Sequence, residues 1–190
     1  DLAEILTGFI RHSDPAVITI PTNGSQSAAI SRVLETIQST GYKGRLHINL
    51  SIDGPGEEHD RIRGSRDLHL KIKNTAALIR AAQKKNPAIW LGVISVAGDH
   101  NTHLIEPLIE WVRDNIAPDI HDIGLERGMI ERGDPGEIIR QYGAVQQKLA
   151  RINPPGTGIE DRVYNALMEY FRDSLRTGRP ADGCRAGRTI

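Results

Sequence analysis

The sequence has little that could crosslink or anchor the protein. Its 190 residues include one cysteine, Cys184, which excludes an internal disulfide framework and favours a reducing compartment. Aromatic residues make up 4% of the chain, and no apolar run approaches the ~20 residues that a membrane span needs. The first residues show no signal-peptide pattern. We therefore expect a soluble, cytoplasmic protein with no membrane partner.

An excess of one charge is also missing. Lys plus Arg and Asp plus Glu number 24 each, so the formal net charge is zero. A balanced chain lacks the positive charge that attracts a nucleic-acid backbone, and we expect no nucleic-acid partner. What is present is 38% hydrophobic residues, which is enough for one globular domain with a core.

Helical and strand patterns alternate over the first two thirds of the chain. The apolar periodicity predicts helices at about 1–11, 25–41, 67–85 and 103–115, and strands at about 16–21, 46–52, 89–96 and 120–125. This alternation predicts an α/β fold with a parallel sheet and right-handed crossovers. After residue 133 the alternation stops. Two helices are expected there, at about 136–151 and 159–176.

Several local details follow from the same patterns. The first helix is predicted to have one apolar face, made of Leu2, Ile5, Leu6, Phe9 and Ile10. Ser25 is predicted to cap the second helix, and Gly41 to end it. Asn101 or Thr102 is predicted to cap the helix before Asn115. Trp90 and Trp111 are predicted to be core residues.

Polar or glycine-containing segments follow all four predicted strands. In parallel α/β sheets the loops meet beyond the carboxyl ends of the strands, which is where ligands bind. These segments indicate a binding site at one edge of the sheet. They are 22–24, 51–54, 95–101 and 126–128.

The second of these segments carries the clearest chemistry. Ser51 and Asp53 alternate across Ile52, so they are expected to point the same way as the strand ends. Arg63 follows ten residues later. A hydroxyl group and a guanidinium group together suit a carboxylate or phosphate ligand. The alternative is that Asp53 and Arg63 only close a surface loop.

Two histidine patterns invite a catalytic interpretation. His59 and Asp60 could be a general base with its orienting partner, but adjacent residues seldom face each other, and a loop-bracing role is favoured. His100 and His103 have no carboxylate or cysteine partner at a metal-ligand spacing, so we interpret them as part of a helix start. His12, His47, His69 and His121 stand alone and are predicted to be structural or exposed.

The motifs are more specific together than separately. A strand ending in TNG, a second ending in LSIDG, the segment HDRIRG and a third strand VISVAGDHNT resemble the middle of a radical S-adenosylmethionine (radical SAM) enzyme. The resemblance covers about residues 1–130. It implies a parallel-stranded, partial (β/α)6 TIM-like barrel, incomplete in this chain. It also implies a core at 1–133, a helical linker at 134–180 and the start of a SPASM- or twitch-like extension at 181–190.

The resemblance also implies roles for single residues. Ser51 and Arg63 would contact the amino-acid carboxylate or the ribose of S-adenosylmethionine, with Asp53 beside them. Asn23 would lie near the bound cofactor, and Ser95 and Asn101 on the ribose and substrate side. The backbone of Glu126, Arg127 and Gly128 would approach the adenine. Cys184, in the tail CRAGRTI, would be the first ligand of an auxiliary iron–sulfur cluster.

The departures from the family pattern concern its cluster. The CxxxCxxC loop that ligates the catalytic [4Fe–4S] cluster is absent, and so is the GGEP-like motif. We therefore expect a fragment that is inactive alone, from a parent enzyme that cleaves S-adenosylmethionine to a 5′-deoxyadenosyl radical. That parent would need a reducing electron donor, and the SPASM-like tail implies a peptide or protein substrate.

Two other classes remain open. One is an ordinary (β/α)-barrel lyase or metal-dependent hydrolase that uses Asp53, His59 and Asp60. The other is a non-catalytic α/β module that binds a carboxylate at the strand ends. The first predicts binding of a divalent metal, and the second predicts ligand binding that is indifferent to S-adenosylmethionine.

Overall fold

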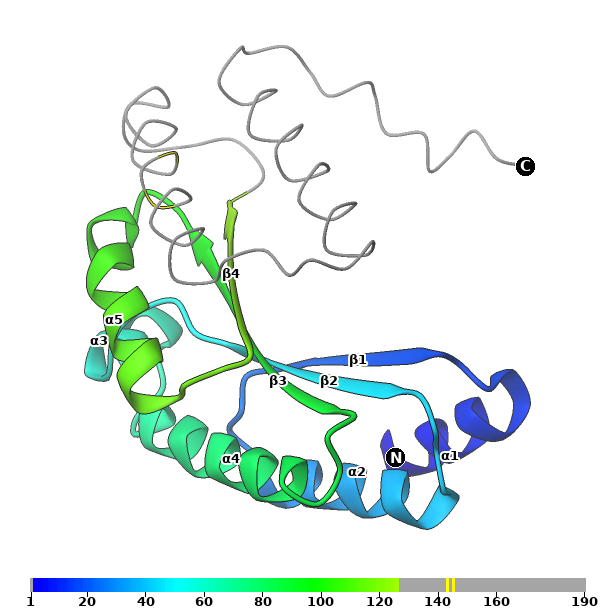
Figure 1. Ribbon diagram of the computed structural model, residues 1–190. Helices are drawn as coiled ribbons and strands as arrows, with labels where there is room; N and C mark the ends of the chain where they lie inside the picture. The colour runs from blue at the N-terminus through cyan, green and yellow to red at the C-terminus, as the bar shows by residue number, and fades with distance from the viewer. Residues whose placement is uncertain (1, 127–142, 144, 146–190) are drawn as a thin grey trace. The chain divides into compact units, whose positions relative to one another are not determined.

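The first part of the chain is a parallel α/β unit. A computed structural model describes residues 2–126, 143 and 145, and the chain divides into compact units at 1–127 and 128–190. The first unit contains a four-stranded parallel sheet in the order β1-β2-β3-β4 (Figure 1). The strands are β1 (Val17–Thr22), β2 (Arg45–Ser51), β3 (Ile89–Ala97) and β4 (Ile120–Leu125). The helices are α1 (Leu2–Ser13), α2 (Ser27–Thr40), α3 (Glu57–Arg63), α4 (Leu68–Gln83), η1 (Thr102–Leu104) and α5 (Ile105–Asn115).

The helices cover one face of this sheet. The strands are paired in sequence order, and right-handed crossovers between successive parallel strands all place their helices on the same side. Figure 1 shows α1, α2, α4 and α5 on that side of the strands. We call it the covered face and the opposite side the open face. The predicted α/β fold with a parallel sheet is confirmed.

The covered face holds the core of the unit. Successive strand residues point to opposite faces, so every second residue is buried against the helices. Ile48, Leu50, Leu91, Val93 and Ile123 are fully buried there. Because a parallel sheet places these residues in register, with Ile48 beside Leu91 and Leu50 beside Val93, the apolar rows are continuous from strand to strand.

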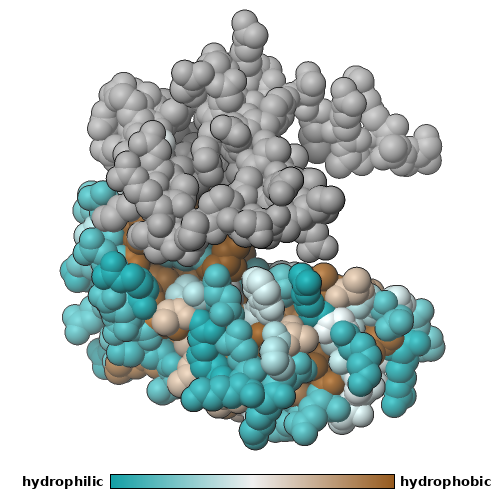
Figure 2. Space-filling model, viewed as in Figure 1, coloured by the Kyte–Doolittle hydropathy of each residue, from teal (hydrophilic) through white to brown (hydrophobic). Residues whose placement is uncertain are grey.

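The open face mixes polar and apolar side chains. The half-exposed residues of β2 are His47, Asn49 and Ser51. The large apolar side chains Val17, Trp90, Val96 and Ile120 are 38–47% exposed on the same face. In the space-filling view, apolar and neutral side chains interrupt the hydrophilic surface of the described residues (Figure 2). Among the described residues, the open face thus offers both polar and apolar side chains.

One core assignment was wrong. Trp90 was predicted to be a core residue, but it lies on the open face, where its ring stacks on that of His47 with a centroid distance of 5.4 Å. On α1, Leu6 and Ile10 of the predicted apolar face are buried, whereas Leu2, Ile5 and Phe9 are exposed.

The caps also differ from the prediction. Ser25 lies before α2 and its hydroxyl donates to Asn23 Oδ1, while Gln26 occupies the cap position without a side-chain hydrogen bond. Gly41 does end α2, with the φ of 65° that favours glycine. Neither Asn101 nor Thr102 caps the helix that follows by a side-chain bond, because both side chains bind the loop before it.

A short helix, α3, was not predicted. The polar segment after β2 was expected to be loop, yet Glu57–Arg63 is helical. The predicted helix at 67–85 corresponds to α4, whose preceding residue Asp67 has a φ of 57° and makes no cap bond. The predicted helices at 136–151 and 159–176 and the boundaries at 133 and 180 lie outside the described residues. None of the described helices is both long and apolar enough to cross a membrane.

Candidate functional site

The predicted site residues that the structure describes lie at one edge of the sheet. The parallel pairing aligns Thr22 with Leu50, Ser51 with Ile94, and Ala97 with Leu125, so the carboxyl ends of all four strands meet there. Asn23, Ser51, Asp53, Ser95, Asn101 and Glu126 all belong to these strand ends or to the loops that follow them. Arg127, Gly128 and Cys184 lie outside the described residues.

The turn after β1 is fixed against α4. Gly24 has a φ of 68°, and a Cβ atom there would lie 2.9 Å from Ile72 Cγ1. The buried hydroxyl of Thr75 donates to the Gly24 carbonyl oxygen at 2.8 Å. Asn23 is exposed, and its Oδ1 accepts hydrogen bonds from the backbone and the hydroxyl of Ser25. Asn23 therefore shapes this turn, and its exposed amide group lies at the predicted binding edge.

Asp53 is the centre of the strand-end cluster. It is 4% exposed, its Oδ1 accepts from the backbone N–H of Val96 at 2.9 Å, and its Oδ2 forms an ion pair with Arg63 Nη2. The Arg63 side chain is 43% exposed and forms no other hydrogen bond or ion pair with a described residue. The observed ion pair is what the loop-closing alternative expects, and binding of a ligand by the exposed part of the guanidinium stays a prediction.

Asn101 joins the ends of β2 and β3. Its amide nitrogen donates to the carbonyl oxygens of Asp53 at 2.9 Å and Val96 at 2.8 Å, and its Oδ1 accepts from Gly98 N–H at 2.8 Å. The side chain is fully buried, and its two N–H groups and its oxygen all have partners. This geometry accounts for Asn101 as a brace between two loops, and its predicted contact with a ribose stays a prediction.

Ser95 and His121 form a buried pair on the covered face. The Ser95 hydroxyl donates to the carbonyl oxygen of Ile52 and lies 2.9 Å from His121 Nε2. Because the hydroxyl proton goes to Ile52, the imidazole donates from Nε2 to Ser95 Oγ. Burial lowers the pKa of His121 to about 4, so the ring is neutral at pH 7. Ser95 is fully buried here, and this bonding fixes the end of β3 to the end of β2.

His59 is buried inside the loop that carries Asp53 and Arg63. It is 0% exposed, and its Nδ1 accepts from the backbone N–H of Asp53 at 3.1 Å. Its Nε2 has no hydrogen-bond partner among the described residues. Burial lowers the pKa of the ring below its usual 6.5, although the nearby Asp53 raises it.

Asp60 does not pair with His59. Its Oδ1 accepts from the backbone N–H of His69 at 2.8 Å, and its Oδ2 lies 2.9 Å from His69 Nδ1. Burial raises the pKa of Asp60, but the hydrogen bonds from His69 outweigh it, and the pKa is lowered overall. This pair connects α3 to α4, in agreement with the loop-bracing interpretation of Asp60.

Ser51 differs from the residues around it. It is half-exposed on the open face, and its hydroxyl has no hydrogen bond to a described residue. It stands two residues before Asp53 at the end of β2. Ser51 and Arg63 therefore both have donors left for a ligand.

A second group of ionisable residues lies at the ends of β3 and β4. One ligand atom each of Asp99, His100 and Glu126 lies within 4.8 Å of the others, and all three residues are exposed. His100 Nδ1 is 3.5 Å from Asp99 Oδ1 and 3.8 Å from Glu126 Oε2. The prediction that His100 has no carboxylate partner was therefore wrong: one partner is its sequence neighbour, and the other comes from the next strand.

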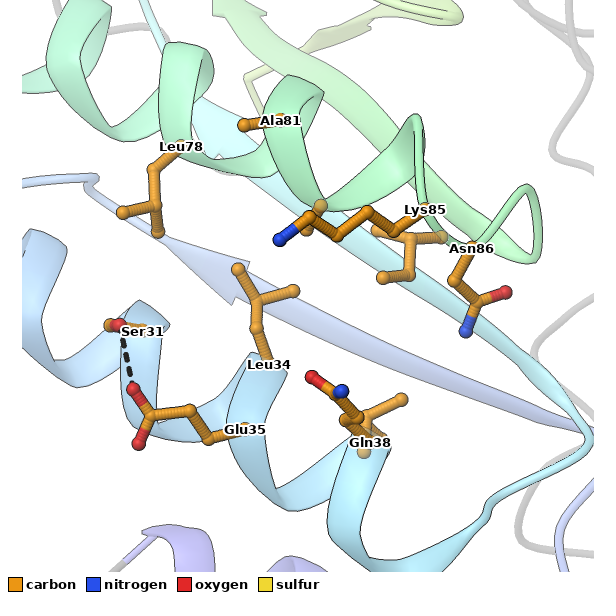
Figure 3. Close-up of a pocket in the computed structure, with 11 residues that line it drawn as sticks. Ser31, Leu34, Glu35, Gln38, Leu78, Ala81, Lys85 and Asn86 are labelled. Atoms are coloured by element: carbon orange, nitrogen blue, oxygen red, sulfur yellow. Dashed lines mark hydrogen bonds between the residues drawn. The ribbon is translucent and has the colours of Figure 1, made fainter.

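A groove on the helix side of the unit lies away from this cluster. It has a volume of about 350 Å3 and lies between α2 and α4, near the amino-terminal end of β3 (Figure 3). Leu34 and Leu78 face each other across it, and Glu35 and Lys85 stand on its two walls. The Glu35 carboxylate accepts from the Ser31 hydroxyl at 3.1 Å. No predicted site residue lines this groove.

The interpretations of His59 as a loop-bracing residue and of His121 as a structural residue agree with the structure, where each makes a specific bond at a strand end. The sequence did not indicate which atoms these bonds join. The only available signal was their position, since His121 is in a strand and His59 follows the SIDGPG segment. The chain matches no protein-family model, and no curated protein matches it either.

Proposed function

We propose that this chain is the central part of a radical SAM enzyme and that its strand-end site binds the carboxylate of S-adenosylmethionine. The four strands would then be part of a partial (β/α)6 barrel. Two features support the barrel: the parallel strands are paired in sequence order, and the helices lie on one face, whereas a doubly wound sheet has helices on both.

The observation that carries the proposal is the orientation of Arg63. A guanidinium group binds a carboxylate best when its planar fork is held in place before the ligand arrives. Here the Asp53 carboxylate holds it, and Val96 N–H fixes Asp53 in turn. Ser51, two residues from Asp53, supplies a second donor on the open face. These are the groups that a zwitterionic amino-acid ligand needs at its carboxylate end.

The residues of this chain do not fit the catalytic iron–sulfur cluster. Such clusters are held by several cysteine thiolates, and the sequence contains Cys184 alone. No step of a radical reaction is therefore derived from these residues. The proposal assigns to them the binding and orientation of S-adenosylmethionine, and Cys184 stays a predicted ligand of an auxiliary cluster. The peptide or protein substrate and the electron donor are proposed on the resemblance alone.

One alternative is favoured by a specific observation. A metal-dependent lyase or hydrolase was expected to use Asp53, His59 and Asp60, but these side chains bind Arg63, the Asp53 backbone and His69. Among the described residues, Asp99, His100 and Glu126 have ligand atoms within 4.8 Å of one another, close enough to share a cation. Titration with Zn²⁺ and Mn²⁺ tests this alternative, because it requires stoichiometric binding that Glu126→Gln removes.

The direct test is calorimetric titration of the whole chain with S-adenosylmethionine. We expect Arg63→Ala to weaken binding about 10- to 100-fold, because a hydrogen bond to a charged group contributes ~1.5–3 kcal/mol. Arg66→Ala is the matched control, since Arg66 is exposed three residues further on and forms no hydrogen bond or ion pair with a described residue. An unchanged affinity with a lower melting temperature would make Arg63 a structural residue of the loop.

A comparison of ligands separates the proposal from a simple carboxylate-binding module. If the site is built for S-adenosylmethionine, methionine and acetate should bind more weakly, because they lack the adenosyl group that would contact the ends of β3 and β4. A module that recognises only a carboxylate would bind methionine and S-adenosylmethionine equally well.

A further inference from the structure

His59 occupies an unusual position beside the Asp53–Arg63 pair. Its ring is completely buried, and its Nδ1 accepts the backbone N–H of Asp53 at 3.1 Å. An N–H group can donate only to an unprotonated ring nitrogen. The ring is therefore neutral in this arrangement and carries its proton on Nε2.

The histidine at position 59 has a second ring nitrogen, Nε2, that forms no hydrogen bond with a described residue. This atom is buried, although buried donors are almost always paired. An asparagine could supply the same acceptor to Asp53, but its side chain does not titrate. What a histidine adds at this position is a ring nitrogen that can take up a proton.

The loop is compact enough to transmit a change at His59. A Cβ atom on Gly54 would lie 3.0 Å from the backbone nitrogen of His59 and 2.9 Å from Ile62 Cδ1. The backbone of Asp53 is thus held between His59 on one side and Asn101 on the other. Since the carboxylate of the same residue holds Arg63, a shift of the Asp53 backbone moves the partner of the guanidinium.

Four ionisable groups act on the ring. Asp53 comes from the turn after β2, Asp60 and Arg63 from α3, and His69 from α4. The two carboxylates favour the imidazolium, while Arg63 and His69 oppose it together with burial, which is the largest influence and lowers the pKa. Protonation of His59 therefore occurs below pH 6.5, the usual value for histidine.

We propose that His59 is a positioning residue that makes ligand binding at Arg63 dependent on pH. The neutral ring accepts the Asp53 N–H and keeps the Asp53–Arg63 pair in place. The imidazolium has no acceptor atom, so two N–H groups would face each other and the loop would move, releasing Arg63. The effect on S-adenosylmethionine binding rests on the proposed function, whereas the effect on Arg63 itself does not.

Hydrogen exchange of the Arg63 Nη2 hydrogens, which form the ion pair with Asp53, tests the proposal without any ligand when measured by NMR on the whole chain. Arg63→Lys identifies the signal by removing it. We expect exchange at pH 5, corrected for its intrinsic pH dependence, to be at least about tenfold faster than at pH 7.5, as the loss of one protecting ion pair predicts. The amide spectrum of β2 and β3 reports whether the protein remains folded.

Two variants distinguish positioning from a structural role. His59→Asn keeps an acceptor that does not titrate, so its Arg63 exchange should stay slow at both pH values. His59→Leu has no acceptor, so its exchange should be fast at both; if this variant does not fold, His59→Asn against wild type still decides. His103→Asn, at an exposed histidine, is the matched control and should behave as wild type.

The affinity for S-adenosylmethionine forms a second arm. Wild type should bind it about tenfold more weakly at pH 5 than at pH 7.5, and His59→Asn equally well at both. Absence of binding at any pH would overturn the proposed function. The role of His59 would then be tested by the hydrogen-exchange experiment alone. Slow Arg63 exchange in folded wild type at pH 5, unfolding before Arg63 is released, or a pH dependence retained in His59→Asn would each overturn the inference.

Discussion

The two faces of the sheet use the same strands for different purposes. On the covered face, the described polar side chains Ser95 and His121 are buried and bonded to each other. On the open face, Ser51 has no described partner, His47 stacks on Trp90, and large apolar side chains remain 38–47% exposed. Alternation along one strand thus separates residues that stabilise the unit from residues that are available for contact.

The largest difference between the two faces should appear in how the free energy of unfolding depends on acidic pH. Burial lowers the pKa of His121 to about 4, while the unfolded chain protonates this histidine near 6.5. The unfolded state therefore binds more protons, and stability is lost as the pH falls from 6.5 to 4, by about 3 kcal/mol at pH 4. Urea unfolding at several pH values measures this loss.

Two histidine variants test which face of the sheet causes this loss of stability in acid. His121→Asn should remove most of the pH dependence. His47→Asn should remove less, because His47 lies on the half-exposed open face, although burial, its largest influence, also lowers its pKa. If both variants reduced the pH dependence of the free energy of unfolding equally, the two faces would not differ in their sensitivity to acid.

Two valines in β3 provide the next comparison. Val93 is fully buried on the covered face and Val96 is 39% exposed on the open face. Val93→Ala should lower the free energy of unfolding by about 2 kcal/mol, since it removes two buried methyl groups and leaves a cavity. Val96→Ala should cost about 0.5 kcal/mol or less. Equal losses in urea unfolding would indicate that the open face is packed like the core.

The smallest effect on stability is expected from a comparison of Ser95 on the covered face with Ser51 on the open face. Ser95→Ala should cost about 1–2 kcal/mol, because the Ile52 carbonyl oxygen and His121 each lose a buried partner. Ser51→Ala should leave the melting temperature unchanged and weaken binding of S-adenosylmethionine. A thermal scan and a titration of each variant check both expectations, and a lowered melting temperature for Ser51→Ala would assign that residue to the fold.

Much of the unit was predictable because local patterns determine it. The alternation of helices and strands predicted all four strands within two residues at each end, and β4 at its observed bounds. The helix α3 was missed although its ends carried a signal. Glu57 and Glu58 in its first turn and Arg63 in its last suit the helix dipole. A run of charges was interpreted as loop because no apolar periodicity accompanied it.

The candidate site was predictable in position but not in detail. The edge where polar segments meet follows from parallel pairing, and Asp53 with Arg63 could be identified there from residue type. The role of Asn101 could not, because a cap and a brace use the same side chain. What decides between them is the carbonyl group of Asp53, which the register of β2 against β3 brings within reach, together with that of Val96 in the same loop.

The most direct test of the account is a map of where S-adenosylmethionine changes the NMR spectrum of the whole chain. We predict that the shifts concentrate at the carboxyl ends of the strands, at Asn23, Ser51 and Arg63, and leave Leu34 and Leu78 in the α2–α4 groove unchanged. Shifts confined to that groove, or no shifts at saturating ligand, would contradict the claim that the strand ends are the binding site.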